Sequence, residues 1–361
     1  MRAGLLAWWV LGGALIGGAA PAFAAEQVRI AVAEHLARAK ITGHALELGP
    51  WGDDATFAPL GRDSAIVRFH RGALTLDGKP AGKGLRLRAS KGLLKVHGFA
   101  VRGTVDVEAT PHGLLVVNAI SLEDYLAAVL GGEMPPSFPP EALKAQAVAA
   151  RTYAIQRKLS MYGNAYHLGA TVLSQVYGGA GREDPRTRAA VDATRGEILT
   201  YDLAPIEAYF HASCGGETES GKAALGRDLP YLRPVRCPCT EDPHTRWSLE
   251  LPEATVARAF HVDASKLKVA VRSTTGRALV LTDGTHRVSG VRFRQKLGYQ
   301  EVKSLGFLLH HKGKNLELSG RGLGHGAGMC QIGAKVLAGR GWTYRQILAH
   351  YYPGTALQRM Y

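Results

Sequence analysis

Short stretches of alternating apolar and polar residues fill the first part of the chain, over about residues 26–118. Ala73-Leu74-Thr75-Leu76 runs into the turn signal Asp77-Gly78, and Leu85-Arg86-Leu87-Arg88 alternates as a half-buried strand does. Leu114-Leu115-Val116-Val117 is a continuous apolar run, which is typical of a buried strand. The pattern predicts a β-rich N-terminal region.

The spacing of apolar residues becomes helical after Ser121. Ser121-Leu122-Glu123-Asp124 suits a capped helix start. One apolar face is then formed by Leu122, Tyr125, Leu126, Val129 and Leu130. Gly131-Gly132 predicts the end of this helix. A second helix is predicted from about residue 141 to 158, because the prolines before it stand where a helix tolerates them.

The remainder of the chain mixes both patterns. Residues 196–320 are mainly strand-like, with a helix predicted near residues 252–260. A glycine-rich loop at residues 322–328 precedes two predicted helices, at about 329–338 and 344–351. Because strands and helices come in separate blocks, we predict an α+β fold with a β-rich N-terminal region and a helical catalytic segment.

The first residues have the pattern of a processed leader. Arg2 precedes an apolar stretch, and Ala22-Phe23-Ala24 fits the small-x-small cleavage rule. An uncleaved anchor is the alternative, although the apolar run is short and interrupted by Gly12-Gly13. We predict a signal peptide at residues 1–24, a β-rich region at 25–110 and a catalytic domain at 111–361. The protein would be secreted across the inner membrane to the periplasm or cell envelope, with no transmembrane segment in the mature chain.

The net charge of the chain is +14 at pH 7. A basic exported protein suits an anionic partner such as peptidoglycan, teichoic acid or lipid head groups. Export argues against nucleic acid, and no Lys/Arg run is interleaved with aromatic residues. The charge is also compatible with an ordinary solvated surface.

The chain contains four cysteines: Cys214, Cys237, Cys239 and Cys330. In an oxidising compartment one or two disulfides are expected, and a bridge from Cys214 to Cys237 or Cys239 is favoured, because Cys330 opens a distant helix. A Zn²⁺ site from His211, three of the cysteines and His244 is the alternative, although the spacing matches no standard zinc pattern.

Glu133 is the first candidate for catalysis. It follows a predicted helix C-terminus, where the partial negative charge disfavours an ionised carboxylate, and burial against Met134 and Phe138 would add to this. A carboxyl group protonated near neutral pH can act as a general acid in glycosidic cleavage. The alternative is an ordinary surface glutamate.

Two cations lie seven residues apart on the second predicted helix. Lys144 and Arg151 are separated by about two turns and therefore share a face of a helix that is otherwise small and apolar. Their partners could be structural carboxylates, Glu123 or Asp124, or carboxylates of the substrate.

The loop Gly322-Leu323-Gly324-His325-Gly326 superficially fits a dinucleotide-binding fingerprint. It lacks a following βαβ unit and an acidic residue about 20 positions further on. A loop whose glycines hold Arg321 and His325 at a cleft is the better interpretation. The chain contains neither Gly-x-Ser-x-Gly nor His-Glu-x-x-His, so serine-hydrolase and zincin chemistry have no support.

Five ordered blocks resemble the stage II sporulation protein D (SpoIID) family, which includes the amidase enhancer LytB. The match covers about residues 110–355, and the blocks are residues 118–135, 141–154, 174–179, 209–216 and 320–334. The resemblance implies a lytic transglycosylase that acts on glycan strands stripped of stem peptides. It implies that Glu133 is the catalytic acid and that substrate is bound by Lys144, Arg151, Tyr177, Tyr209, His211, His325 and Gln331.

The resemblance also bears on cofactors and partners. Some family members carry a His/Cys metal cluster just before the Gln175-Val176-Tyr177 block. Here His167 remains, but Ser174 stands where a cysteine would be, so we predict no metal and no cofactor. A cell-wall amidase is a possible partner. The rival function is therefore a LytB-like activator that binds glycan and stimulates an amidase without cutting.

Overall fold

The structure is a computed structural model that describes residues 26–52, 56–170 and 177–361. The expected leader and Ser174 lie outside these ranges, so the signal peptide and the missing metal cluster stay predictions. Within the described ranges, none of the helices has the length and apolar character needed to cross a bilayer.

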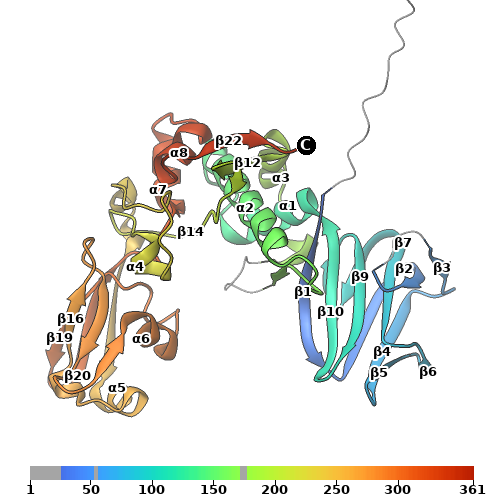
Figure 1. The fold of residues 1–361 in the computed structure, drawn as a ribbon, viewed down its shortest axis with the longest axis horizontal. Coiled ribbons are helices and arrows are strands. Elements are labelled where there is room, and N and C mark those ends of the chain that lie inside the picture. Colours follow the sequence, from blue (N-terminus) through green and yellow to red (C-terminus); the bar gives the residue numbers. More distant parts are fainter. Residues whose placement is uncertain (1–25, 53–55, 171–176) are drawn as a thin grey trace, which may run out of the picture.

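A mostly antiparallel sheet of 11 strands forms the N-terminal part of the molecule, on the right of Figure 1. Its path is β11-β1-β10-β9-β7-β2-β4-β5-β6, with β3 paired to β2 and β8 to β7. The strands are β1 Gln27–Leu36, β2 Arg38–Pro50, β3 Ala58–Pro59, β4 Ser64–His70, β5 Ala73–Leu76, β6 Lys79–Pro80, β7 Gly84–Val96, β8 Phe99–Val101, β9 Thr104–Thr110, β10 Gly113–Ser121 and β11 Leu168–Gly169.

The strand predictions in this sheet are confirmed with one correction. β5 has the predicted bounds, and β10 contains the predicted buried run. In β7 the alternation of Leu and Arg implied a polar face, yet Arg86 is only 2% exposed. It is buried because its guanidinium pairs with the buried carboxylate of Asp106 on β9, at 2.6 Å.

Helix α2 lies at the centre of the molecule (Figure 1). It packs against α1, α3, α7, α8 and strand β12. Its sequence is rich in alanine, and small side chains allow neighbouring elements to approach closely. The helices are α1 Leu122–Glu133, α2 Pro140–Ser160, α3 Pro185–Ala193, α4 Gly221–Leu225, α5 Glu253–Phe260, α6 Gly290–Leu297, α7 Gln331–Gly339 and α8 Tyr344–Tyr351.

Two small sheets pair segments that lie far apart in the sequence. Antiparallel β12 Glu197–Tyr201 pairs with β13 Ala204–Pro205 and with the C-terminal strand β22 Ala356–Arg359. β14 Phe210–His211 runs parallel to β21 Met329–Cys330, with His211 opposite Cys330. This second pairing joins residues more than a hundred positions apart.

Residues 246–321 form a second unit, on the left of Figure 1. It contains two three-stranded sheets, β15-β20-β19 and β16-β17-β18, with helices α5 and α6. The strands are β15 Arg246–Pro252, β16 Lys268–Arg272, β17 Ala278–Thr282, β18 Arg287–Ser289, β19 Phe307–Lys312 and β20 Asn315–Arg321. Its buried residues make a hydrophobic core of their own.

The main core follows different boundaries from the predicted domains. One continuous cluster runs from Val28 in the large sheet through α1 and α2 to Tyr352. The fold is α+β as predicted, and helices α2, α5 and α8 lie close to their predicted positions. Helices α3, α4 and α6 were not predicted, since they are short and have mixed composition.

Candidate functional site

Glu133 is the last residue of helix α1 and its side chain is half-buried. The following residue, Met134, is 1% exposed, and its backbone N–H donates to the carbonyl oxygen of Leu130 at 3.0 Å. The carboxylate therefore stands at the helix C-terminus, where the helix dipole disfavours negative charge.

The predicted end of this helix at Gly131-Gly132 is wrong. Both glycines are helical, and α1 continues to Glu133. A Cβ atom on Gly131 would lie 2.0 Å from the carbonyl oxygen of Arg182. Glycine is required there because the 3₁₀ turn η1 (Gly179–Arg182) packs directly against the helix, and not because the helix stops.

Two buried tyrosines pack on each other along helix α1, which ends at Glu133. Tyr125 lies about two turns earlier on α1 and is fully buried. Burial, and then the charge of Glu133, raises the pKa of the Tyr125 phenol well above its ordinary value, so this phenol stays protonated. Its ring lies 5.3 Å from that of Tyr177.

Tyr177 has a packing role in this geometry. It is 3% exposed and its hydroxyl donates to Oδ1 of Asn118 at 2.6 Å. Its ring also meets Phe99 edge-on at 5.8 Å. The expectation that Tyr177 binds substrate is therefore not met, because both its ring and its hydroxyl are occupied inside the protein.

Lys144 lies near the surface of α2. Its ammonium group is 2.7 Å from Oε1 of Glu141, and it sits 5.9 Å from the ring centre of Tyr344. The other carboxylate oxygen of Glu141 accepts the backbone N–H of Tyr344 at 2.7 Å. Lys144 is thus partly exposed and can reach a bound anion, while Glu141 ties α2 to the start of α8.

Arg151 has the structural partner that the sequence left open. It is fully buried, and its guanidinium donates to both carboxylate oxygens of Glu123, at 2.9 and 2.7 Å. Its other N–H groups donate to Thr194 Oγ1 and to the carbonyl oxygens of Glu197 and Val191. The prediction that Arg151 binds a substrate carboxylate is wrong in this structure, because all these donors are used inside the core.

Tyr209, His211 and His325, three of the residues predicted to bind substrate, lie next to one another. The ring of His325 lies 6.0 Å from Tyr209 and 5.4 Å from His211, and Tyr209 meets Tyr153 of α2 at 5.8 Å. Glycines allow this approach: a Cβ on Gly324 would lie 2.8 Å from Cβ of His211, at a backbone φ of +112°. Arg321, predicted beside His325, is exposed at the end of β20.

The hydrogen bonds of the two histidines define their tautomers. Nδ1 of His325 accepts the N–H of Ala327 at 3.1 Å, so its Nε2–H donates to the carbonyl of Phe210 at 3.0 Å. Nδ1–H of His211 donates to the carbonyl of Ala327 at 3.0 Å, which leaves Nε2 as a buried acceptor without a partner in the described residues. Burial lowers the pKa of His325 to about 4 and that of His211 well below its ordinary value. Both rings are neutral at pH 7.

Gln331 joins helix α7 to α2. Its Nε2 donates to Oε1 of Gln146 at 3.4 Å, and both side chains are buried. Tyr209, His211 and His325 therefore form one array that meets α2 through Tyr153, and Gln331 contacts the same helix through Gln146. Sequence reasoning missed Tyr125, Gln146 and Tyr153 as members of these clusters. The available signal was their position as large or polar residues in helices otherwise built from small apolar ones.

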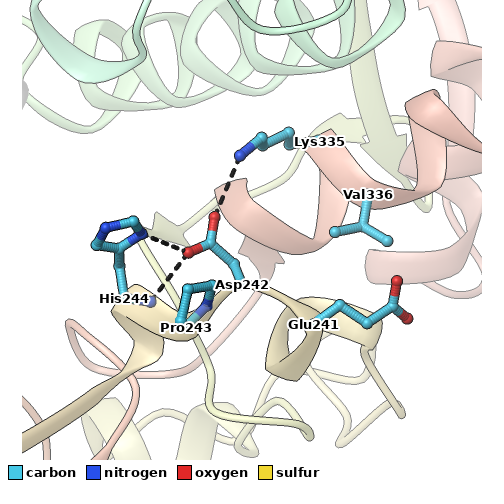
Figure 2. Close-up of a pocket in the computed structure, with 6 residues that line it drawn as sticks. All are labelled: Glu241, Asp242, Pro243, His244, Lys335 and Val336. Carbon is cyan, nitrogen blue, oxygen red and sulfur yellow. Dashed lines mark hydrogen bonds and ion pairs between the residues drawn. The ribbon is translucent and has the colours of Figure 1, made fainter.

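A surface pocket of about 330 Å³ lies beside α7 (Figure 2). It is lined by Glu241, Asp242, Pro243, His244, Lys335 and Val336. Asp242 accepts from His244 at 2.8 Å and pairs with Lys335 at 3.1 Å, as the dashed lines show. The Lys335 ammonium also sits 5.3 Å from the ring of Phe138, in the loop after Glu133. The pocket itself does not include Glu133.

The cysteines differ from the predicted arrangement. Cys330 was expected to lie apart, but the β14–β21 pairing brings it to the other three, and all four thiols are buried and unlinked. Neither histidine of the predicted zinc alternative joins them: His211 bonds to Ala327 and His244 to Asp242. His167 remains from the metal motif that some family members carry; it accepts the N–H of Arg29 at 3.2 Å, and burial lowers its pKa to about 4.

Comparisons with known proteins found one matching family model and several relatives. A family model described as SpoIID, stage II sporulation protein, matches residues 110–201. An uncharacterised protein of Brachyspira hyodysenteriae is 36% identical over 248 residues, 67% of this chain and 67% of the relative. The stage II sporulation protein D of Bacillus subtilis is 32% identical over 294 residues, 72% and 82% of the two chains. The amidase enhancer of the same organism is 30% identical over 290 residues, 64% and 40% of the two chains.

Proposed function

Because the chain belongs to the SpoIID family, we propose that it is a lytic transglycosylase that cleaves peptide-stripped peptidoglycan strands and leaves 1,6-anhydro-N-acetylmuramic acid ends. The observation that carries this proposal is the position of Glu133, a half-buried carboxyl group at the C-terminus of α1 and beside Tyr125. We further propose that residues 1–24 export the chain and that it acts in the periplasm or cell envelope.

Other glutamates around α1 and α2 are unsuited to the role of acid. Glu123 pairs with Arg151, Glu141 with Lys144, and Glu183 with Arg102. Burial raises the pKa of each carboxyl, but hydrogen bonds from these cations hold all three pKa values below their ordinary range. They therefore remain ionised near neutral pH, where a general acid has to be protonated.

The proposed reaction needs one carboxyl group. Glu133 donates its proton to the glycosidic oxygen after N-acetylmuramic acid, and the bond from that oxygen to C1 breaks. The Glu133 carboxylate then takes the proton of the C6 hydroxyl of the same sugar as its oxygen bonds to C1. The anhydro ring closes without consuming water, and Glu133 is again protonated. Ordinary glycosidases instead use two carboxyl groups.

The preference for stripped strands follows from charge. Removal of the stem peptides exposes a lactyl carboxylate on each muramic acid. Lys144 is a half-buried cation in the first turns of α2 that can meet such a carboxylate, since Arg151 is enclosed in the core. The net charge of the chain, +14, also favours an anionic polymer.

A digestion assay tests the proposal. Purified protein is incubated with strands that an amidase has stripped, and products are analysed by mass spectrometry for anhydro ends. Wild type should produce them and Glu133→Gln should not. Glu250→Gln is a matched control, because Glu250 is half-exposed in the second unit and pairs with Lys312. Comparable cleavage by Glu133→Gln would remove Glu133 from the role of acid.

A non-catalytic activator of a cell-wall amidase is the second candidate, favoured by the similarity to an amidase enhancer. The two functions separate in one experiment. If the chain acts by binding alone, wild type should produce no anhydro ends, and Glu133→Gln should stimulate a purified amidase as well as wild type does.

A further inference from the structure

Four cysteine side chains from three distant segments converge in the interior. Cys214 follows β14, Cys237 and Cys239 flank Pro238 at the start of the 3₁₀ turn η2 (Pro238–Glu241), and Cys330 is the N-cap of α7. All four are buried, and their sulfur atoms lie within 4.8 Å of one another. The sulfurs of Cys214 and Cys239 are 3.4 Å apart.

These separations fit a single centre better than two covalent pairs. Zn²⁺ binds four thiolates tetrahedrally at about 2.3 Å, which places neighbouring sulfurs roughly 3.8 Å apart. A disulfide requires sulfurs at about 2.05 Å. Four sulfurs that all lie near one another surround a point, whereas two bridges would draw them together as separate pairs.

Hydrogen-bond donors point at the sulfur atoms. Backbone N–H groups of Cys214 and Gly333 lie 3.4 and 3.3 Å from Cys330 Sγ, and that of Gly216 lies 3.2 Å from Cys239 Sγ. The hydroxyl of Tyr351 is 3.1 Å from Cys237 Sγ. Donors of this kind orient metal-bound thiolates, and the N-terminus of α7 adds a positive dipole at Cys330.

The surroundings leave room for the sulfurs and fix the backbone around them. A Cβ on Gly333 would lie 2.1 Å from the hydroxyl oxygen of Tyr351 and 2.3 Å from Cys237 Sγ, so glycine is required at this position. Arg277 donates to the carbonyl oxygens of Cys214 and Glu217 at 2.8 and 2.9 Å. Since Arg277 also lies 3.6 Å from the buried carboxylate of Glu219, its charge has a partner of its own, and its part here is to fix the backbone around Cys214.

We propose that Cys214, Cys237, Cys239 and Cys330 bind one Zn²⁺ ion as a closed structural site. Binding releases four thiol protons to solvent and uses every coordination position, so the ion has no open place for a reactant. The site fastens the turn after β14, η2 and the start of α7 to one another. Since His211 pairs with Cys330 and Gln331 follows it, the ion holds the base of the histidine array.

Metal and thiol analysis of the unreduced wild-type protein tests this directly. Protein expressed with zinc in the medium should contain one zinc per chain by elemental analysis. After unfolding with chelator and without reductant, four thiols should be alkylated. Disulfides would give fewer alkylated thiols before reduction than after it, and an empty cluster would give four thiols without metal; either result overturns the proposal. Co²⁺ should reproduce the absorption of a tetrahedral thiolate site.

Two glycine variants of α7 provide a matched pair. Gly333→Ala places a methyl group against Cys237 Sγ and the Tyr351 hydroxyl that contacts it, and should weaken zinc affinity about 10–100-fold. Gly339→Ala should leave affinity unchanged, because its added Cβ meets no other described part of the chain within 4 Å outside its own helix backbone and chain neighbours. Equal affinity in both variants contradicts the site. The readout is zinc content and not strand cleavage, so it is independent of the role proposed for Glu133.

Discussion

The second unit, residues 246–321, and the rest of the described chain, which we call the main unit, are stabilised in different ways. The main unit contains two buried ion pairs, Arg151 with Glu123 and Arg86 with Asp106, and a cluster of four buried cysteines. The core of the second unit is apolar and aromatic, with Phe293 packed between Phe260 and Phe307 at ring distances of 5.2 and 6.1 Å. Arg321 is the one predicted cleft residue within the second unit, at its last position, and its side chain is exposed.

Buried ion pairs and aromatic packing contribute differently to a fold. A buried ion pair contributes little net stability compared with apolar packing, but it becomes costly when one partner is removed. Such pairs suit a region where particular side chains must be held in position. Aromatic packing suits a region that only has to stay folded. The two units meet at a buried contact, where Arg277 of the second unit lies 3.6 Å from Glu219.

The largest effect should come from Glu133. If the chemistry belongs to the main unit, Glu133→Gln should lower the cleavage rate by about 10²–10⁴-fold, the range typical of a lost general acid. It should shift the melting temperature little. Glu250→Gln in the second unit should keep wild-type activity. Initial rates of anhydro-product formation, measured with thermal melts, check this. If both variants lost activity equally, the chemistry could not be assigned to the main unit.

Substitutions at Arg151 test the contribution of its buried ion pair with Glu123. Arg151→Met should destabilise the protein by about 3–5 kcal/mol, because Glu123 is left as a buried unpaired charge. Phe293→Ala should lose a similar amount by opening a cavity. The two differ in rescue: the double variant Arg151→Met with Glu123→Leu should recover most of the stability in urea unfolding. Failure of this rescue would mean that the pair does more than satisfy its own charges.

The contact between the units should be weaker than either core. Arg277→Met leaves Glu219 buried without its cation and removes the hydrogen bonds to Cys214 and Glu217, at an expected loss of about 3 kcal/mol. Calorimetry should then resolve two transitions where wild type shows one. A single transition shifted as a whole would show that the units remain coupled through other contacts.

Stability of the main unit should depend on pH through its neutral histidines. The folded pKa of His325 is lowered to about 4 by burial, so between pH 6.5 and 4 the unfolded chain binds more protons. Stability is therefore full above pH 6.5 and falls as the pH approaches 4. Because the ring is partly exposed, we expect a loss of about 2 kcal/mol. Melting curves of His325→Gln, in which this ring is absent, should show a smaller loss over the same window.

Lys144 should give the smallest effect. Its partly exposed pair with Glu141 contributes at most about 1 kcal/mol to stability. Lys144→Met should lower kcat/KM for stripped strands about fivefold and leave rates on peptide-bearing strands unchanged. The same factor for both substrates would contradict its proposed contact with the lactyl carboxylate.

Local pattern was sufficient to predict much of the fold. The α+β class, strand β5, the buried run in β10, the Ser121 cap and helices α2, α5 and α8 follow from hydrophobic period and capping residues. These features depend on neighbours within a few positions, which a single sequence displays. The five blocks also pointed to Glu133 and to Tyr209, His211, His325 and Gln331, which the structure brings to α2.

Which residues far apart in the sequence contact one another was determined only by the tertiary structure. Arg151 binds Glu123 and not substrate, Gly131 admits η1 and does not end its helix, and Cys330 joins cysteines that are about a hundred positions away. Each depends on which segments pack together, and neither periodicity nor spacing encodes that choice. A charge buried in one packing is exposed in another, so its role as a structural or a binding group is settled by the fold around it.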